Sequence, residues 1–377
     1  MPTVPDSKFN KVSVLGKIFF ILSLILINFS LLSQITRYSN DFLNIGATAQ
    51  GIALGNGLIA SSQGASAIYY NPANITNLSN SFDFAITHSQ YFANTANYDA
   101  LLAAYKYNNN ISLGLGIIRL GIDNIPNTLN IYNNGSFNLA QITYFSVEDY
   151  AVLFVWAQKR SKFSYAIRPK FIYRHLGSFA QGFGFGIDAS ISFKWKKINF
   201  GANFNDILGT YTAWFYSLDQ HTINVFDSTG NEIPHNSIEI AIPSTQLGIN
   251  RNFNINNKIQ LKNEFNLFIQ WTYQTAAIIS SSLASISPAF STEIIYKKVI
   301  FFRVGLSNFQ KINFFVSNNS TEFRERINFV PSIGLGFRYH KIIIDYSFQN
   351  VFNKTIPLQS HFITARFPLD LKNKKEN

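Results

Sequence analysis

Apolar and polar residues alternate along much of this chain, the pattern of a β-strand with one apolar face. Residues 183–195 show it in its simplest form. The odd positions are apolar, whereas the even positions are small, polar or charged: Phe183, Phe185, Ile187, Ala189, Ile191, Phe193 and Trp195 against Gly184, Gly186, Asp188, Ser190, Ser192 and Lys194. Alternation alone fits both a soluble sandwich and a membrane barrel, so the length and number of such segments must decide between them.

Fourteen segments of this kind follow one another along the chain. They lie at residues 82–93, 97–107, 111–120, 145–160, 163–175, 181–195, 197–207, 241–254, 258–270, 289–298, 299–308, 328–340, 341–350 and 359–368. Most have the length of about 10 residues that a tilted strand needs to cross a bilayer, whereas soluble strands are usually nearer 5–6. The pattern therefore predicts an all-β fold, a transmembrane antiparallel β-barrel of about 14 strands, over residues 81–368.

The connections between the segments alternate in length. Short turns are expected at 108–110, 161–162, 196, 255–257, 297–298 and 340–341, and longer connections at 121–144, 176–180, 208–240, 271–288, 309–327 and 351–358. Outer-membrane barrels have short periplasmic turns and longer outer loops. An even number of strands then places both termini on the periplasmic side. We expect the long 208–240 loop to contribute to contacts with a partner.

The first 33 residues have the composition of a secretory signal. Lys8, Lys11 and Lys17 precede a largely apolar run of 15 residues at 18–32, which is short for a membrane-spanning helix. We expect cleavage near Ser33, with an uncleaved N-terminal anchor as the alternative. The predicted organisation is a signal peptide at 1–33, a plug segment at 34–80, the barrel at 81–368 and a polar periplasmic tail at 369–377.

Composition supports a chain that meets lipid. Charged residues make up 14% and aromatic residues 16%, whereas soluble domains carry about 25% charged residues. Aromatic girdles are expected at the strand ends, including Trp156, Trp195, Trp214 and Trp271. The formal charge is +11, but no clustered Lys/Arg stripe indicates a nucleic-acid partner. The absence of cysteine excludes disulfides, thiolate metal sites and a lipoprotein anchor.

Charged residues on the polar faces of the strands should point into the lumen, because a charge on the lipid face costs about 2–4 kcal/mol at the bilayer midplane. The predicted lumen-lining charges are Arg168, Lys170, Arg174, Asp188, Lys262, Glu264, Glu293, Arg303, Arg338 and Asp345. They form either a structural network of ion pairs or the wall of a selective pore or ligand cavity. Glycines on the same faces leave room for a plug from the chain itself.

The residues offer little support for catalysis or a metal centre. His88 and His361 could meet where the first and last strands pair, but a catalytic group would also need a positioned acid and nucleophile. A metal set from His221, His235, Asp219 and Asp227 matches no compact ligand motif. We therefore expect a protein without catalytic residues, metal or cofactor.

The segment before the first strand does not alternate and is rich in Gly, Ala, Ser and Asn. Its runs at 39–46, 53–57 and 70–73, with the stretches 118–129 and 182–189, resemble the PorV/PorQ family of Bacteroidetes-like bacteria. These outer-membrane barrels are related to the FadL fatty-acid channel and linked to type IX secretion. The resemblance implies a fourteen-stranded barrel with an N-terminal plug. The plug motif would comprise Gly46, Gly55, Gly57, Asn71 and Pro72.

Two functions from different classes follow from this resemblance. The first is a type IX secretion accessory protein that binds and shuttles or helps sort cargo, with outer-membrane lipid, the secretion translocon and cargo bearing a C-terminal sorting domain as partners. The alternative is a FadL-like channel for long-chain fatty acids or other hydrophobic molecules. A continuous apolar pocket in the lumen and a break in the barrel wall would favour the channel.

Overall fold

The computed structural model describes residues 40–133, 136–315, 323–351 and 358–370. The predicted signal peptide at 1–33 and the tail beyond residue 370 lie outside the described residues. Among the described residues, no helix is long and apolar enough to cross a membrane.

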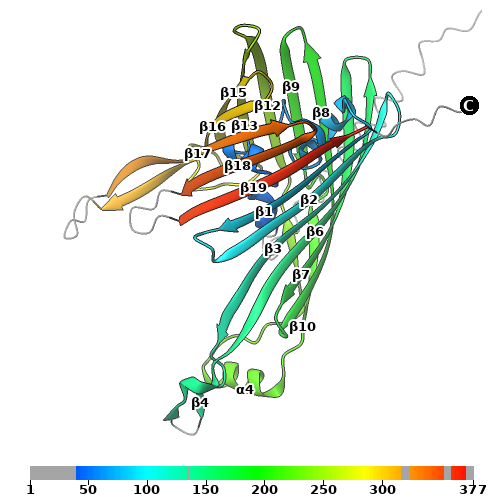
Figure 1. The fold of residues 1–377 in the computed structure, drawn as a ribbon. Coiled ribbons are helices and arrows are strands. Elements are labelled where there is room, and N and C mark those ends of the chain that lie inside the picture. The colour runs from blue at the N-terminus through cyan, green and yellow to red at the C-terminus, as the bar shows by residue number, and fades with distance from the viewer. Residues whose placement is uncertain (1–39, 134–135, 316–322, 352–357, 371–377) are drawn as a thin grey trace, which may run out of the picture.

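A closed antiparallel barrel of 14 strands forms the wall of the molecule (Figure 1). Each strand pairs with its neighbours in chain order, and β1 closes the ring on β19. The strands are β1 (Phe82–Tyr91), β2 (Ala96–Lys106), β3 (Ile111–Asn127), β6 (Thr143–Arg160), β7 (Phe163–Leu176), β8 (Ala180–Trp195), β9 (Ile198–Asn205), β12 (Ser244–Asn254), β13 (Ile259–Gln270), β15 (Ser285–Tyr296), β16 (Ile300–Phe315), β17 (Phe323–Tyr339), β18 (Ile342–Val351) and β19 (Leu358–Leu369). The predicted fold class is confirmed.

Two wall strands are interrupted and continue as separate strands. β10 (Thr210–Tyr216) continues β9 after a break at 206–209, because both pair with β8 at different heights. β11 (Ser237–Ala241) continues into β12 across residues 242–243. Helix α4 (Gln220–Ser228) lies between β10 and β11, so the predicted loop 208–240 is largely ordered. The Asp219 carboxylate accepts a hydrogen bond from the Thr222 backbone amide at the start of the helix, and this bond lowers the pKa of Asp219.

The remaining elements lie in the longer connections. They are β4 (Tyr132–Asn133), β5 (Ser136–Phe137), η5 (Leu139–Gln141) and β14 (Ile279–Ser280). The connection predicted as long at 176–180 is a three-residue turn, because β7 runs to Leu176 and β8 begins at Ala180. Gly177, at a φ of +49°, makes this tight reversal possible.

The strands alternate between lipid and interior as the sequence predicts. On β8, Phe183, Phe185 and Ile191 are exposed on the outer face, whereas Asp188 and Ser190 are buried on the inner face. Six short turns gather at one end of the barrel, where β19 also ends (Figure 1). The long connections extend from the other end, which also holds the tight turns between β1 and β2 and between β7 and β8. We refer to these as the turn end and the loop end.

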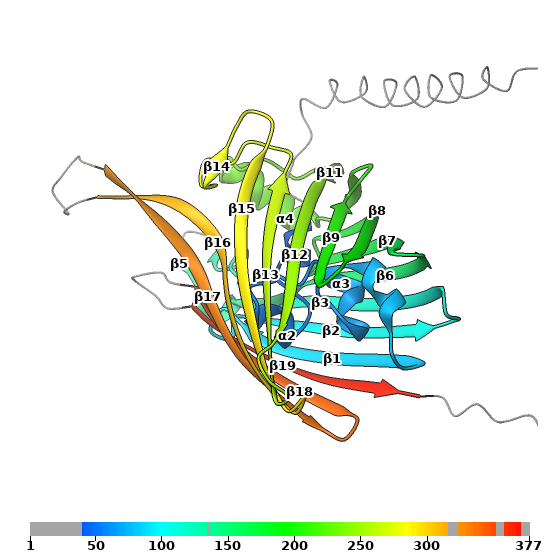
Figure 2. The same cartoon turned by 90° about the horizontal axis from the view of Figure 1, so that it is seen from above.

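The N-terminal residues 40–80, here named the interior segment, lie inside the barrel (Figure 2). This segment comprises η2 (Asp41–Asn44), α2 (Ala49–Ala53), η3 (Gly64–Ser66), α3 (Ala67–Tyr70) and η4 (Pro72–Asn77). Thr48 caps α2, and Asn71 caps η4 with Pro72 in the first helical position. Its apolar side chains, among them Ile52, Ile68 and Ile75, form one core with the inner faces of the wall strands.

Candidate functional site

The interior segment is hydrogen-bonded to the barrel wall on all sides. Its backbone amides donate to Thr364 of β19, Glu264 of β13 and Asp83 of β1, through Ala49, Ala60 and Ala65 at 2.7, 2.7 and 3.1 Å. Its carbonyls at Ala53 and Gly57 accept from Ser332 of β17 and Ser291 of β15. Contacts with so many strands hold the segment across the lumen.

Glycines of the wall let the interior segment approach closely. A Cβ atom on Gly201 of β9 would meet the Ile59 carbonyl, and one on Gly305 of β16 would meet the backbone of Leu54 and Gly55. Because these neighbours are backbone atoms, no side-chain movement could relieve the clash. Of the residues named in the plug motif, Gly55 and Gly57 lie against Ser307 and Asn266 of the wall, whereas Gly46 contacts Asn56 within the interior segment itself. Asn71 donates to the Ile59 carbonyl within the segment and to the Ile191 carbonyl of β8, and Pro72 begins η4.

One charge cluster joins β7 and β8 to the interior segment. The Asp188 carboxylate pairs with Arg168 at 2.8 Å and with Lys170 at 2.9 Å. Arg168 also donates to the carbonyls of Ile68 and Tyr69 at 2.9 and 2.7 Å. Asp188 also accepts a hydrogen bond from the Asp206 backbone amide, and Lys170 pairs with the Asp206 carboxylate. The cluster therefore also holds the break after β9 in place.

A second cluster crosses β13, β15, β16 and β18 in alternating sign. Lys262 pairs with Glu293 at 3.0 Å, Glu293 pairs with Arg303 at 2.7 Å, and Arg303 pairs with Asp345 at 2.7 Å. Arg303 is one of the largest fully buried side chains of the described residues. Buried charges of this kind persist only when they are paired.

The structure also pairs inner-face charges that the sequence did not single out, either with one another or with the predicted Arg174. Arg366 of β19 forms a two-pronged pair with Asp83 of β1, across the strand pair that closes the barrel. Arg174 pairs with Asp149 at 2.7 Å and with Glu239 at 3.3 Å. Strand parity alone could have placed Arg366, Asp149 and Asp83 on the inner face.

Two of the expected residues stand apart from these clusters. Glu264 is buried beneath the interior segment, where one carboxylate oxygen accepts the Ala60 amide and the other has no hydrogen-bond partner among the described residues. Arg338 is an exposed inner-face residue near the turn end, with its guanidinium 5.6 Å from the centre of the Phe301 ring.

The expected girdle position of Trp214 is wrong. Its ring is buried on the inner face, with the Arg174 guanidinium 5.0 Å from the ring centre. The break at 206–209 reverses the parity: Phe200 and Phe204 point outward on β9, but Thr212 and Trp214 point inward on β10. Trp156 and Trp195 are exposed on the outer face, and Trp271 is exposed just beyond the end of β13.

A polar cavity of about 740 Å³ opens at the turn end, beneath the interior segment. Its lining includes residues 60–64 and 77–79 of that segment and the turn-end parts of β6 to β9, β12, β13, β1 and β19. Six cationic side chains line it: Lys159, Lys162, Lys194, Lys196, Lys262 and Arg366. Asp83 is the single carboxylate in the lining.

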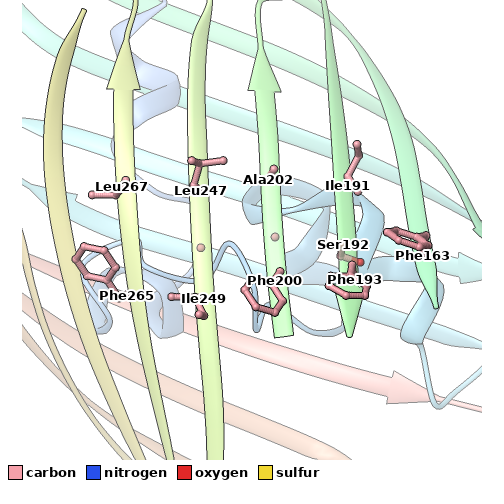
Figure 3. Close-up of a pocket in the computed structure, with 12 residues that line it drawn as sticks. Phe163, Ile191, Ser192, Phe193, Phe200, Ala202, Leu247, Ile249, Phe265 and Leu267 are labelled. Carbon is pink, nitrogen blue, oxygen red and sulfur yellow. The ribbon is translucent and has the colours of Figure 1, made fainter. Parts of the chain in front are cut away.

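A shallow apolar groove of about 460 Å³ lies on the outer wall over β8, β9, β12 and β13 (Figure 3). It forms because Ala202 is small, whereas its neighbours Ile191, Leu247 and Leu267 on the same outer row are large. The groove faces the lipid and is separated from the lumen by the wall. It therefore belongs to the membrane-contacting surface.

The direct pairing of β15 with β16 stops short of the loop end. Their ladder ends at the pair Phe290–Leu306, although β15 begins at Ser285 and β16 continues beyond residue 306. The connection after β13 inserts in the space between them. Its residues Ile279 and Ser280 pair with β15, and Ala277 forms a bridge to Gln310 of β16. Figure 2 shows β16 and β17 diverging from β15.

Aromatic rings cover this separation. Phe290 of β15 lies 6.1 Å from Phe309 of β16, and Phe309 lies 5.5 Å from Phe329 of β17, measured between ring centroids. A bulge in the β16–β17 ladder between Ser307 and Gln310 brings Phe309 into this row. We name Ala277 to Ser280 the wedge, because these residues hold the two wall strands apart while remaining bonded to both.

Comparison with solved structures places this architecture among known barrels. CymD, a monoaromatic hydrocarbon channel, is 11% identical with a TM-score of 0.54, covering 87% of this chain and 98% of its own. The toluene transporter TbuX of Ralstonia pickettii is 12% identical with a TM-score of 0.53, covering 86% of this chain and 98% of its own. The toluene transporter TodX of Pseudomonas putida is 10% identical with a TM-score of 0.54, covering 86% of this chain and 99% of its own. The chain has a FadL-like fold.

Searches of family models and of curated proteins found no match. The FadL-like fold agrees with the barrel and N-terminal segment that the PorV/PorQ resemblance implies, but that family itself is not confirmed. Because the sequence identities are this low, these comparisons show a shared fold and nothing more.

The two histidines near the barrel closure, His88 and His361, bond to other residues and not to each other. His88 pairs with Asp99 at 2.7 Å and His361 bonds to Tyr346 at 2.7 Å, both on the outer face. In the strand register His88 lies opposite Ile363, and His361 lies opposite Gln90. No cluster of His, Cys, Asp and Glu able to hold a metal ion occurs within the described ranges.

Proposed function

We propose that this protein is an outer-membrane channel through which small hydrophobic molecules pass by leaving the barrel sideways. The separation of β15 and β16 carries the proposal. Toward the loop end β15 and β16 are joined only through the wedge, which is held to β16 by a single bridge, so a displacement of the wedge would open a path through the wall.

The interior segment makes a sideways route preferable to a straight one. It spans the lumen toward the turn end and is bonded to strands on every side. The space beneath it is polar and cationic, so a hydrocarbon would lose its apolar surroundings there. A molecule that leaves between β15 and β16 passes the row of Phe290, Phe309 and Phe329 and enters lipid directly.

The similar structures also support transport of hydrophobic molecules. CymD is described as a monoaromatic hydrocarbon channel, and TbuX and TodX as toluene transporters. A role in type IX secretion rests on the sequence resemblance alone, and no contact of the described residues favours it over transport. Hydrophobic transport is therefore the function that we adopt.

A reversible cross-link tests the route. The chain has no cysteine, so the double variant Ala277→Cys/Gln310→Cys would contain a single disulfide joining the wedge to β16. Opposed residues of an antiparallel pair lie about 4.5–5.5 Å apart between Cα atoms, within disulfide reach. We expect oxidation to slow toluene entry into proteoliposomes by about ten-fold or more, and a reductant to restore the rate.

The control places the same cross-link elsewhere in the wall. Phe337 and Ile344 face each other on the outer side of β17 and β18, far from the wedge in the register. Their double cysteine variant should transport toluene equally well in both redox states. Equal transport by the oxidised and reduced wedge variant would exclude this route. Recovery of a translocon or of sorting-domain cargo with the native protein, without toluene entry, would instead support the secretion role.

A further inference from the structure

The cavity at the turn end has an unusual balance of charge. Its six cationic side chains face one carboxylate, that of Asp83, which Arg366 and the Ala65 amide already engage. Lys262 is paired with Glu293, and Lys159 donates to the Asn77 side chain at 3.1 Å. Glu264, beneath Ala60, is held by that residue's amide.

Besides Lys159, which donates to an amide oxygen, three further lysines of the lining have no carboxylate partner among the described residues. Within the described part of the chain, Lys162, Lys194 and Lys196 form no ion pair; the Lys196 ammonium lies over the Trp195 ring, 5.2 Å from its centre. Lys162 and Lys196 lie in two neighbouring turns, between β6 and β7 and between β8 and β9, and Lys194 lies near the end of β8. The six short turns at this end contain seven lysines and no acidic residue: Lys162, Lys196, Lys197, Lys258, Lys297, Lys298 and Lys341. Their like charges raise the positive potential at the mouth of the cavity.

We propose that this cavity binds a multivalent phosphate-bearing anion. Lysine ammonium groups bind phosphate as compact point charges, and the serine and asparagine side chains that line the remainder can donate to its oxygens. The volume of about 740 Å³ falls within the range of pockets for small molecules. Such an anion could be a soluble phosphate ester or the headgroup of a phospholipid.

The position of the cavity gives the anion a structural consequence. Ser61, Ser62 and Gln63 of the interior segment form part of one wall, and Lys162 and Lys194 of the barrel form another. A bound anion would therefore connect the segment to the barrel and stabilise the closed arrangement. This inference does not depend on the proposed transport of hydrophobic molecules, because the two sites lie on opposite sides of the interior segment.

Calorimetry on the full-length protein in detergent tests the site, with inorganic pyrophosphate as the probe. We expect saturable binding, and the double variant Lys162→Gln/Lys194→Gln, which removes two of the cationic donors, should weaken it by about ten-fold or more, a loss of about 1.4 kcal/mol or more. The control Lys258→Gln/Lys341→Gln removes the same charge from other turns at this end, outside the lining, and should weaken binding much less.

A second titration with short-chain phosphatidylglycerol distinguishes the source of the phosphate. Competition between this lipid and pyrophosphate would assign the site to a headgroup, whereas pyrophosphate binding without lipid binding would assign it to a soluble ester; both outcomes support the proposal. Equal weakening in the two double variants would show attraction by general charge and overturn it. Binding of an oligoglutamate peptide in preference to pyrophosphate would also overturn it. Toluene transport is measured separately, so failure here leaves that function untouched.

Discussion

Asp188 is the carboxylate on which the first charge cluster depends. It is buried on the inner face and bonded to Arg168, Lys170 and the Asp206 amide. Replacing it with asparagine would leave two buried cations with one fewer counter-charge. We expect Asp188→Asn to destabilise the barrel by about 3–5 kcal/mol, measured by urea unfolding in detergent micelles.

Asp99 provides the matched control for this substitution. It pairs with His88 and Arg119 on the outer face, with its side chain 37% exposed. Exposed pairs contribute about 0–1 kcal/mol, so Asp99→Asn should cause a much smaller loss. Equal losses of unfolding free energy in the two variants would mean that the buried cluster stabilises the barrel no more than the exposed pair does.

Residue faces were predictable here, but residue partners were not. A period of two assigns Arg303, Glu293 and Asp345 to the inner side from local sequence alone. Which of them meet depends on the register between strands, and Arg303 and Asp345 are 42 residues apart. The expected girdle position of Trp214 failed for another reason: residues 210–216, expected in a loop, form a strand, and the break at 206–209 exchanges the two faces within that wall strand.

At the level of elements, the strands and the interior segment differ in what the sequence reveals. All fourteen predicted strands are present near their expected positions, because lipid on one side imposes a strict alternation over many residues. The interior segment meets protein on every side, so its sequence has no period. Its small residues indicated close packing, but its path and its contacts with Thr364 or Glu264 required the structure. The wedge likewise could not be predicted, because the connection at 271–288 that contains it has no alternating pattern and was expected to be a loop.

The fit of the interior segment against the wall can be tested at Gly305. A side chain there would meet the backbone of Leu54 and Gly55. We expect Gly305→Val to displace α2 from the wall, to lower the unfolding free energy by about 1–3 kcal/mol and to raise ion conductance in planar bilayers.

The control for this variant adds the same volume on the other side of the wall. Ala202 lies on the outer face within the lipid-facing groove, so Ala202→Val should leave both stability and conductance close to the native values. An unchanged conductance in Gly305→Val would show that the segment does not depend on this contact to stay in place.

The orientation of the whole molecule in lipid gives a further prediction. Trp156 is exposed on the outer face, whereas the Trp214 ring is buried within the barrel. In single-tryptophan variants reconstituted with brominated lipids, we expect strong quenching of the fluorescence of Trp156 and weak quenching of that of Trp214. Comparable quenching of the two would contradict the reversal of faces at the break.

The interior segment bonds to both the first and the last strand of the wall, and this imposes an order on assembly. Ala65 bonds to Asp83 of the first strand, and Ala49 bonds to Thr364 of the last, 315 residues away in the chain. A ring that closed while empty would have to reopen to admit a segment so widely attached. Synthesis from the N-terminus delivers residues 40–80 before any strand and β19 after every other, so the wall can form around its own filling. The seam between β1 and β19 is then the last to be joined, and it should remain unjoined in a chain whose interior segment has been removed.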